Sequence, residues 1–313
     1  MLLERQNAHP LDSALTFDES AHVYTYTPAN SPVRVSVSGV LKRHFPSDFN
    51  GAAVVKKNFG TWLVNVDHKY HSLASYLVLV KKLTLEQAGR EIEALWSTVG
   101  ERARNDGTRM HSQLELYLNC ELPPPPTPGF PPPHEIRAYQ ALMEDFYPEM
   151  QLRPFRTEFK MVLTTTFSQL PLGDEITLPV VAGSADLLMI DKLNRIWILD
   201  WKRTDPRKKG LLGRATPSKF VKHVEEGIFT GCENDDFAKY SAQLLAYKYI
   251  LEHGGYDMQV AAAFVVQIHP TLERAHVVEA GEGLGEDFED RVCAMMEAEV
   301  RLAREEVTSR NGM

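Results

Sequence analysis

Three charged residues interrupt or end two apolar runs in the middle of the chain. Asp186 follows Gly-Ser-Ala within the first run, and Asp200 and Lys202 flank Trp201 at the end of the second. Residues two apart on a strand point to the same face, so Asp200 and Lys202 share a face that Trp201 does not. The short polar turn at residues 191–194 predicts an antiparallel hairpin, which brings Asp186 near Asp200.

This pattern could hold a divalent metal ion. Two carboxylates a few ångströms apart repel each other, and a divalent cation is a natural way to hold them together. A lysine beside such an ion can transfer a proton or stabilise charge next to a metal-bound water. Charged residues directly after a buried strand more often mark only the point where the chain reaches the surface. The pattern therefore needs support from other parts of the sequence.

Polar residues at helical or strand spacing elsewhere supply that support. His111 and Glu115 are four residues apart, on one face of an expected helix, and His111 is a reasonable metal ligand. Glu115 is either a ligand or an acid on a solvated face. Glu158 lies in an expected strand at the sheet edge of the same site. Gln243 and Tyr247 are again four apart, and their amide and hydroxyl could bind a phosphate or orient the lysine.

A basic segment follows the Asp200 strand. Residues 202–222 contain eight Lys and Arg, among them Arg203, Lys208 and Lys209, against the single acid Asp205. The whole chain is acidic, with 34 Lys and Arg against 42 Asp and Glu and a net charge of −8. A local basic patch on an acidic protein predicts a focused phosphate-binding surface. The alternative is a solvated, mobile loop.

Expected secondary structure places these residues on a small sheet with helices on both sides. A β-hairpin is expected over residues 17–37, mainly helical structure over 51–118, and a proline-rich insertion over 122–133. The further elements alternate between helices and strands and predict an α/β fold. They are helices at 135–146, 236–252 and 285–307, and strands at 156–167, 180–190, 195–201, 260–268 and 275–279.

Composition excludes several classes of protein. The 313 residues are 43% hydrophobic and 24% charged, as in ordinary globular domains, which argues against disorder. The three cysteines are far apart and form no Cys-x-x-Cys pair, so neither a cysteine-based metal cluster nor a disulfide framework is expected. No apolar stretch approaches the length of about 20 residues that a membrane helix needs. We expect an intracellular protein, in the cytoplasm, nucleus or mitochondrion, with no membrane partner.

The order of these motifs resembles the PD-(D/E)XK nuclease superfamily, in particular its RecB-like branch. The resemblance covers about residues 96–252 and includes His111, Glu158, Gly-Ser-Ala-Asp186, Asp200-Trp-Lys202 and Gln243-Leu-Leu-Ala-Tyr247. The Ser-Val-Ser-Gly-Val-Leu segment near the start looks most like the mitochondrial genome maintenance exonuclease group and its viral relatives. Gly-Ser-Ala-Asp replaces the Pro-Asp of other branches. The sequence lacks the cysteine cluster of the iron–sulfur members and a nucleotide-binding Gly-x-x-x-x-Gly-Lys loop, so no ATP is expected.

The resemblance implies a metal site and a fold. By resemblance, His111, Asp186, Asp200 and the backbone carbonyl of Trp201 would bind Mg²⁺ or Mn²⁺, and Lys202 would position or deprotonate the attacking water. The implied fold is α/β, a restriction-endonuclease-like core in which a small mixed sheet is flanked by helices. The expected domains are an N-terminal β-hairpin and helical elaboration (residues 1–95), the nuclease core (96–280) and a C-terminal acidic helix (281–313).

The remaining roles follow the same resemblance. Glu158 would be a further catalytic acid, and Gln243 and Tyr247 would orient the lysine and the DNA backbone. Arg203, Lys208 and Lys209 would bind DNA.

The expected function is a metal-dependent deoxyribonuclease, an exonuclease that acts on single-stranded DNA ends in repair, replication or recombination. Three alternatives stay open at this point. They are a structure- or site-specific endonuclease of a virus or mobile element, a catalytically silent DNA-binding module, and an acidic scaffold protein with a chance motif. The sequence leaves cleavage polarity, the choice between DNA and RNA, and the oligomeric state undecided.

Overall fold

The computed structural model describes residues 2–46, 50–120, 133–169, 174–206 and 222–311. Contacts divide the chain into two compact units, Met1–Pro46 with Met110–Met313, and Ser47–Arg109. These divisions fall at different residues from the domain boundaries expected from the sequence, which stay a prediction. The proline-rich insertion lies almost wholly outside the described residues. Within them, no helix is both long enough and apolar enough to cross a membrane.

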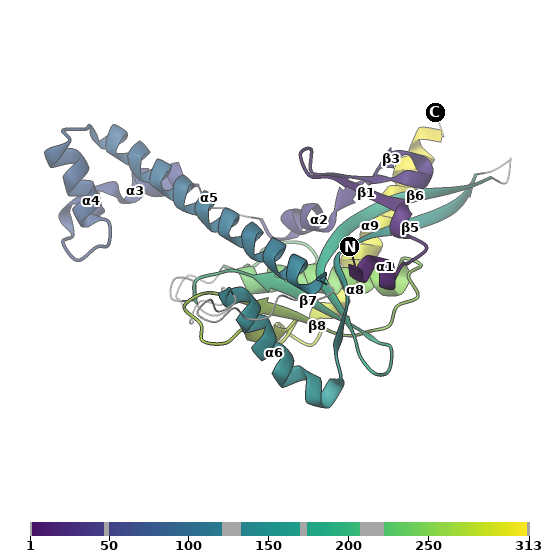
Figure 1. Cartoon of the computed structure of the whole chain (residues 1–313). Coiled ribbons are helices and arrows are strands. Elements are labelled where there is room, and N and C mark those ends of the chain that lie inside the picture. The colour runs from purple at the N-terminus through teal and green to yellow at the C-terminus, as the bar shows by residue number, and fades with distance from the viewer. Residues whose placement is uncertain (1, 47–49, 121–132, 170–173, 207–221, 312–313) are drawn as a thin grey trace. The chain divides into compact units, whose positions relative to one another are not determined.

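The larger unit contains a mixed β-sheet (Figure 1). Its described strands are β4 (Val35–Ser36), β5 (Arg153–Gln169), β6 (Asp174–Ile190), β7 (Ile196–Lys202), β8 (Val260–Gln267) and β9 (His276–Glu279). The order is β4-β6-β7-β8-β9, and β5 also pairs with β6. β5, β6 and β7 are antiparallel neighbours, whereas β7 and β8 are parallel and are connected through the helix α8 (Asp236–His253). The predicted strands and their alternation with helices are thus confirmed.

A tight turn sets the register between β6 and β7. The Asp191 carboxylate accepts hydrogen bonds from the backbone N–H of Leu193 (2.8 Å) and Arg195 (2.9 Å), and from Trp197 Nε1 (3.1 Å). Asn194 has a positive φ of 60°, a conformation that asparagine tolerates better than most residues. The hairpin predicted from the polar residues at 191–194 is therefore confirmed, with Ile190 opposite Ile196 and Leu187 opposite Leu199.

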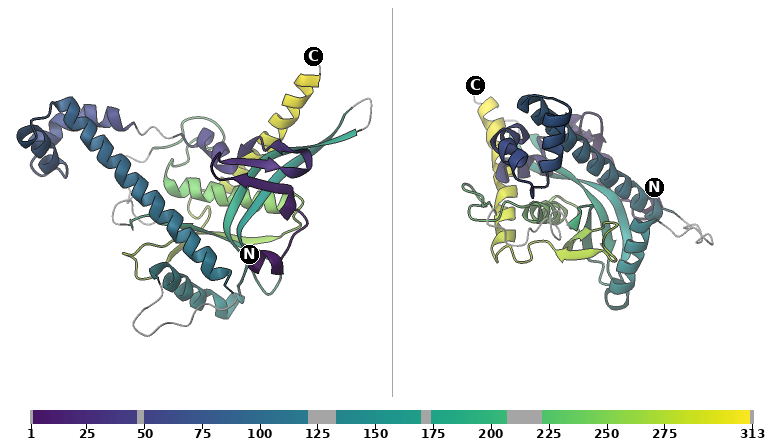
Figure 2. Two further views of the ribbon diagram at one scale, coloured as in Figure 1. Left: turned by 45° about the horizontal axis from the view of Figure 1, so that its top comes forward. Right: turned by 90° about the vertical axis from the view of Figure 1, so that its left-hand side faces the viewer.

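Helices cover both faces of this sheet (Figure 2). α2 (Val37–His44), α8 and α9 (Phe288–Asn311) pack on one face, where they bury Ile198 and Leu188. α6 (His134–Met150) and the residues after Arg109 of α5 (Leu85–Leu118) pack on the other, against Trp201. β7 is buried on both sides, which explains its continuous apolar sequence. The mixed α/β architecture is confirmed.

The N-terminal segment differs in part from its prediction. After α1 (Leu2–Gln6), β1 (Leu15–Asp18) pairs with β2 (Val23–Tyr26), and β2 pairs with the short β3 (Ser31–Pro32). The expected hairpin ends there, because Val35 of β4 pairs in parallel with Val181 of β6 instead. The Ser36 hydroxyl then accepts a hydrogen bond from Gly39 N (3.1 Å) and caps α2.

The C-terminal helix α9 packs back onto the larger unit. Phe288, Val292, Met295 and Met296 of α9 are at most 1% exposed and belong to the same core as α8. The buried Glu299 forms ion pairs with Arg34 (2.5 Å) and Arg43. Although its composition is acidic, α9 is therefore an integral part of the larger unit.

The unit Ser47–Arg109 is helical. It contains α3 (Gly51–Val64), α4 (His71–Ser75), a single π-helical turn at Tyr76–Val80, and residues 85–109 of α5. Asn50 caps α3 by accepting a hydrogen bond from Ala53 N (3.0 Å). A separate small core holds these helices together, made of Val55, Phe59, Trp62, Ala74, Leu77, Ala88 and Ile92. Within the region 51–118 that was expected to be mainly helical, Leu85–Leu118 form one continuous helix of 34 residues.

Candidate metal centre

Three carboxylates occupy neighbouring positions on three adjacent strands. In the β5–β6 register, Thr157 and Phe159 lie opposite Leu187 and Ala185, which places Glu158 across from Asp186. Extending the β6–β7 ladder by one position beyond Leu187 and Leu199 places Asp186 across from Asp200. The sheet thus brings together acids that are 14 and 28 residues apart in the sequence. The proximity of Asp186 to Asp200 follows the hairpin predicted from sequence.

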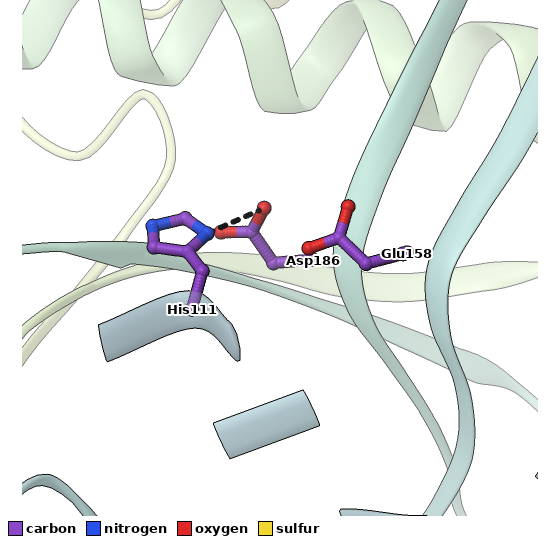
Figure 3. Close-up of side chains that lie close together, drawn as sticks. All are labelled: His111, Glu158 and Asp186. Carbon is purple, nitrogen blue, oxygen red and sulfur yellow. Dashed lines mark ion pairs between the residues drawn. The ribbon is translucent and has the colours of Figure 1, made fainter. Parts of the chain in front are cut away.

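His111 comes from α5 and completes a group of possible metal ligands (Figure 3). Its neighbour Met110 and Leu114 are buried on the sheet, and this fixes the end of the helix that carries His111. His111 Nε2 donates to the carbonyl oxygen of Trp201 (3.0 Å), and Nδ1 lies 3.4 Å from Asp186 Oδ1. One ligand atom each from His111, Glu158 and Asp186 lie within 4.8 Å of one another.

Asp186 is the best-connected of the three acids. Its Oδ2 accepts a hydrogen bond from Trp201 N (2.7 Å), and its Oδ1 faces the His111 ring. Burial on its own raises the pKa of Asp186, but the hydrogen bond and charge of His111 outweigh burial and lower the pKa below its usual range. Asp186 is therefore a carboxylate at neutral pH.

Asp200 and Lys202 form a buried ion pair beside this group. Asp200 is 2% exposed, and its Oδ2 lies 2.5 Å from Lys202 Nζ. That oxygen receives no hydrogen bond of normal geometry from the described residues. Burial raises the pKa of Asp200 to about 6, Lys202 opposes this rise, and Asp186 adds to it. Burial lowers the pKa of Lys202, but Asp200 and Asp186 outweigh it and raise the pKa, so Lys202 is an ammonium at neutral pH.

Glu158 differs from the other acids in its backbone as well as its charge. It has a positive φ of 45°, which costs a residue with a side chain roughly 1 kcal/mol and is found disproportionately at functional sites. Burial and the nearby Asp186 charge raise the pKa of Glu158 to about 7. The Ser184 hydroxyl donates to Glu158 Oε2 at 3.4 Å.

The helix α8 presents Gln243 and Tyr247 to the same region of the sheet. Gln243 Nε2 donates to the Tyr247 hydroxyl (2.7 Å), and the Tyr247 ring is buried. A Cβ added at Gly183 would lie 2.4 Å from Tyr247 Cε1. The glycine of Gly-Ser-Ala-Asp therefore gives the tyrosine ring the space to lie directly on the β6 backbone.

The structure brings together most of the residues expected from the sequence. They lie where the C-terminal part of β7 runs beside the interior of β6 and β5, and they are His111, Glu158, Asp186, Asp200, Lys202 and the Trp201 carbonyl. The Arg203 side chain, which follows Lys202, is 13% exposed, and its Nε lies 4.0 Å from Glu135 Oε1. Lys208 and Lys209 lie outside the described residues.

One residue near Lys202 was not identified from the sequence. The ammonium of Lys202 lies over the Tyr240 ring, 4.6 Å from its centroid. Such a contact stabilises a buried cation by about 1 to 2 kcal/mol. Tyr240 precedes Gln243 by three positions and Tyr247 by seven, so the helical spacing of one face was the available signal.

The donor set of this cluster fits a divalent cation. An imidazole and carboxylates are ligands that Mn²⁺ accepts, and the carboxylates also suit Mg²⁺. Burial alone would lower the pKa of His111, but the hydrogen bond and negative charge of Asp186 raise it to about 9. A cation at the site would therefore compete with a proton on His111 and, near neutral pH, with one on Glu158.

The melting temperature in EDTA is therefore expected to fall as pH rises. Folding raises the pKa of Glu158 from 4.5 to about 7 and that of His111 from 6.5 to about 9. The folded state therefore binds more protons than the unfolded state between each pair of values, and its stability falls as the pH rises through those two ranges. Stabilisation by Mn²⁺ should grow over the same pH range. A pH series of melting curves with and without Mn²⁺ checks this. In His111→Gln the loss between pH 7 and 9 should disappear, and a wild-type curve parallel to that variant would contradict the prediction.

Gly183→Ala is expected to destabilise the protein by about 1 to 3 kcal/mol, because the new methyl group overlaps the buried Tyr247 ring. Gly107→Ala is the matched control. Gly107 lies within α5, nothing approaches its Cβ position within 4 Å, and the helix should gain roughly 0.5 to 1 kcal/mol. Urea unfolding of both variants measures the two effects, and equal shifts would count against close packing at Gly183.

Comparisons with known proteins do not assign this chain to a family. No protein-family model matches the chain, and the comparison with curated proteins finds no match. Among solved structures, the one described as the crystal structure of SSO0001 is 13% identical and aligns over 80% of this chain and 84% of its own length, with a TM-score of 0.25. A likeness at that TM-score carries no argument about fold or function.

Proposed function

We propose that this protein is a metal-dependent deoxyribonuclease with a PD-(D/E)XK core of the RecB-like kind. The observation that carries the proposal is the convergence of His111, Glu158, Asp186, Asp200 and Lys202 on three adjacent strands and one helix. A row of acids with a buried lysine is difficult to explain by stability alone, because buried ionised groups are costly unless fully paired.

His111, Glu158 and Asp186 would hold Mg²⁺ or Mn²⁺. When bound, such an ion lowers the pKa of a coordinated water and neutralises charge on a phosphate group. Backbone groups of Trp201 orient two of these ligands. The Trp201 carbonyl fixes the His111 ring, and the Trp201 N–H fixes the Asp186 carboxylate. Partners of this kind orient the ligand side chains and raise their affinity for the ion.

Lys202 would stabilise negative charge on the phosphodiester during hydrolysis. Because Asp200 and Asp186 raise its pKa, it is a cation at neutral pH and a poor general base. Its contacts with Asp200 and the Tyr240 ring hold the ammonium in place on the same face as Asp186. Preorganised charge of this kind is typically the largest contribution to catalysis of such reactions.

The substrate follows from charge and from the sequence resemblance. The basic composition of residues 202–222 supports a polyanionic substrate, and its first lysine belongs to the site itself. The resemblance favours single-stranded DNA with a free end, in repair, replication or recombination. A structure- or site-specific endonuclease and a catalytically silent DNA-binding module are the outcomes that would replace this proposal.

The test is a titration of Mg²⁺ and Mn²⁺ with end-labelled linear and closed circular single-stranded DNA, with Lys202→Ala beside the wild type. Cleavage of the linear strand alone, lost in Lys202→Ala, supports an end-dependent exonuclease, and the label gives its polarity. Cleavage of the circle points to an endonuclease. Binding of DNA by both proteins without cleavage in either metal points to the silent module.

A further inference from the structure

The helical unit Ser47–Arg109 contains a cavity of about 780 Å³. Residues from α3, from the segment that follows it and from the first half of α5 line the cavity, and they include Asn58, Trp62, His68, Tyr70, Leu95 and Trp96. The cavity is open to solvent, and its volume lies within the range of about 300 to 1,000 Å³ that is typical of ligand sites.

Several aromatic rings line this cavity. The Trp62 ring stacks on His68 (centroids 5.7 Å apart, planes at 11°) and contacts Tyr70 at 4.9 Å and Trp96 at 5.9 Å. Trp96 Nε1 donates to the Tyr70 hydroxyl at 2.9 Å, which locks two of the rings together. Two of the four tryptophans in the chain thus line one cavity in a unit of 63 residues.

Two polar groups beside the rings are available to a ligand. Asn58 Nδ2 donates to Val54 O (2.8 Å), and its amide oxygen has no donor among the described residues. His68 Nδ1 accepts from Tyr70 N (3.2 Å), which in the neutral ring places the proton on Nε2 as a donor. The cavity therefore combines stacking faces with one hydrogen-bond acceptor and one donor, the combination that recognises the edge of a planar heterocycle.

Charge indicates which kind of ligand fits. Lys69 also lines the cavity and lies over the Tyr70 ring (5.0 Å), and none of the lining residues is an acid. The unit Ser47–Arg109 has nine Lys and Arg against seven Asp and Glu, whereas the whole chain has a net charge of −8. The positive charge of Lys69 disfavours a cationic ligand, and an apolar peptide would leave Asn58 and His68 without partners. An anionic ligand with a planar base satisfies all these groups.

We propose that this cavity binds an unpaired nucleobase of a single-stranded nucleic acid. The base would stack on the aromatic rings, and Lys69 would lie near its phosphate. Stacking of a base on an aromatic side chain contributes roughly 1 to 3 kcal/mol and tolerates any sequence. The proposal rests on the proposed function only in naming DNA rather than RNA as the strand.

Tryptophan fluorescence of the full chain in EDTA tests this without cleavage. Trp96 is half-buried and lines the cavity, while Trp62, Trp197 and Trp201 are only 5%, 8% and 2% exposed, so a stacked base should quench mainly Trp96. Single-stranded oligothymidylate is the probe. An abasic strand of the same length, with the same phosphates and no bases, is its control. Quenching by the first and not by the second supports the cavity.

A pair of variants on exposed leucines localises the effect. Leu95 is 44% exposed and lines the cavity, whereas Leu79 is 61% exposed in the same unit and does not. Leu95→Glu should weaken binding roughly tenfold or more, while Leu79→Glu, with the same added charge, should bind as the wild type does. Circular dichroism confirms that both variants fold.

Three outcomes would overturn the proposal: no quenching by oligothymidylate, equal quenching by the abasic strand, or equal binding by both variants. Quenching by an apolar peptide in place of the oligonucleotide would assign the cavity to a protein partner. The two proposals fail separately. Cleavage of DNA in Mn²⁺ without quenching in EDTA would contradict only the proposed base-binding cavity. Quenching without cleavage would contradict only the proposed nuclease activity.

Discussion

Replacing Lys202 with methionine is expected to lower the rate of DNA cleavage by about a thousandfold while Mn²⁺ still binds. Methionine preserves most of the length of the side chain and removes its charge. Lys202 is not among the grouped ligand atoms of His111, Glu158 and Asp186, so those ligands remain. What is lost is the cation that lies 2.5 Å from Asp200 Oδ2 and over the Tyr240 ring.

The same change has a second, independent signature in stability. Without the lysine, the buried Asp200 carboxylate has lost its partner, and its pKa, already raised to about 6, should rise further. Lys202→Met should therefore be less stable than the wild type above that pKa. The difference should shrink under acid conditions, where Asp200 is protonated in both proteins. Single-turnover cleavage of linear single-stranded DNA measures the effect on rate. Melting curves recorded above and below the Asp200 pKa of about 6 measure the effect on stability.

Lys192→Met is the matched control for this variant. Lys192 is exposed in the turn at the other end of the same hairpin, and its removal takes away the same charge without touching the site. It should cleave and melt as the wild type does. Full activity in Lys202→Met, or an equal loss in both variants, would remove Lys202 from the mechanism.

The part of the site that could be predicted from sequence is the part set by local geometry. Alternation along a strand places Asp200 and Lys202 on one face, and the polar residues at 191–194 identify the turn that brings Asp186 across from Asp200. Both depend on a few neighbouring residues. The positions of Gln243 and Tyr247 follow equally from helical spacing, and their mutual hydrogen bond confirms it.

The remaining geometry depends on packing between distant segments. His111 is 75 residues from Asp186 in the sequence and reaches it only because its helix neighbours Met110 and Leu114 are buried on the sheet. The place of Glu158 in the ligand group requires the β5–β6 register and a positive φ, neither of which its sequence neighbours indicate. The expectation grouped Asp200 with the ligands more firmly than Glu158, whereas in this structure the Asp200 carboxylate pairs with Lys202.

Neutral replacements of Glu158 and Asp186 are expected to have opposite effects on stability and the same effect on function. At about pH 8 Glu158 is ionised against burial and the charge of Asp186, so Glu158→Gln should raise the free energy of unfolding in EDTA by on the order of 1 to 2 kcal/mol. Asp186 instead stabilises the His111 cation and accepts from Trp201 N. Asp186→Asn should lower the free energy by on the order of 2 kcal/mol.

Both variants should lose Mn²⁺ stabilisation and cleavage, because each removes a carboxylate from the group that would hold the ion. The two changes are equal in kind, acid to amide on adjacent strands, so each is the control for the other. As the pH falls from about 7 to about 4.5, the gain in Glu158→Gln should shrink to nothing, while at about pH 5.5 the loss in Asp186→Asn persists. If both variants lost stability and kept their response to Mn²⁺, these carboxylates would be structural and the metal site would have to lie elsewhere. If Glu158→Gln is more stable than the wild type but inactive, the Glu158 carboxylate costs stability and is needed for function. That combination is expected of a metal ligand.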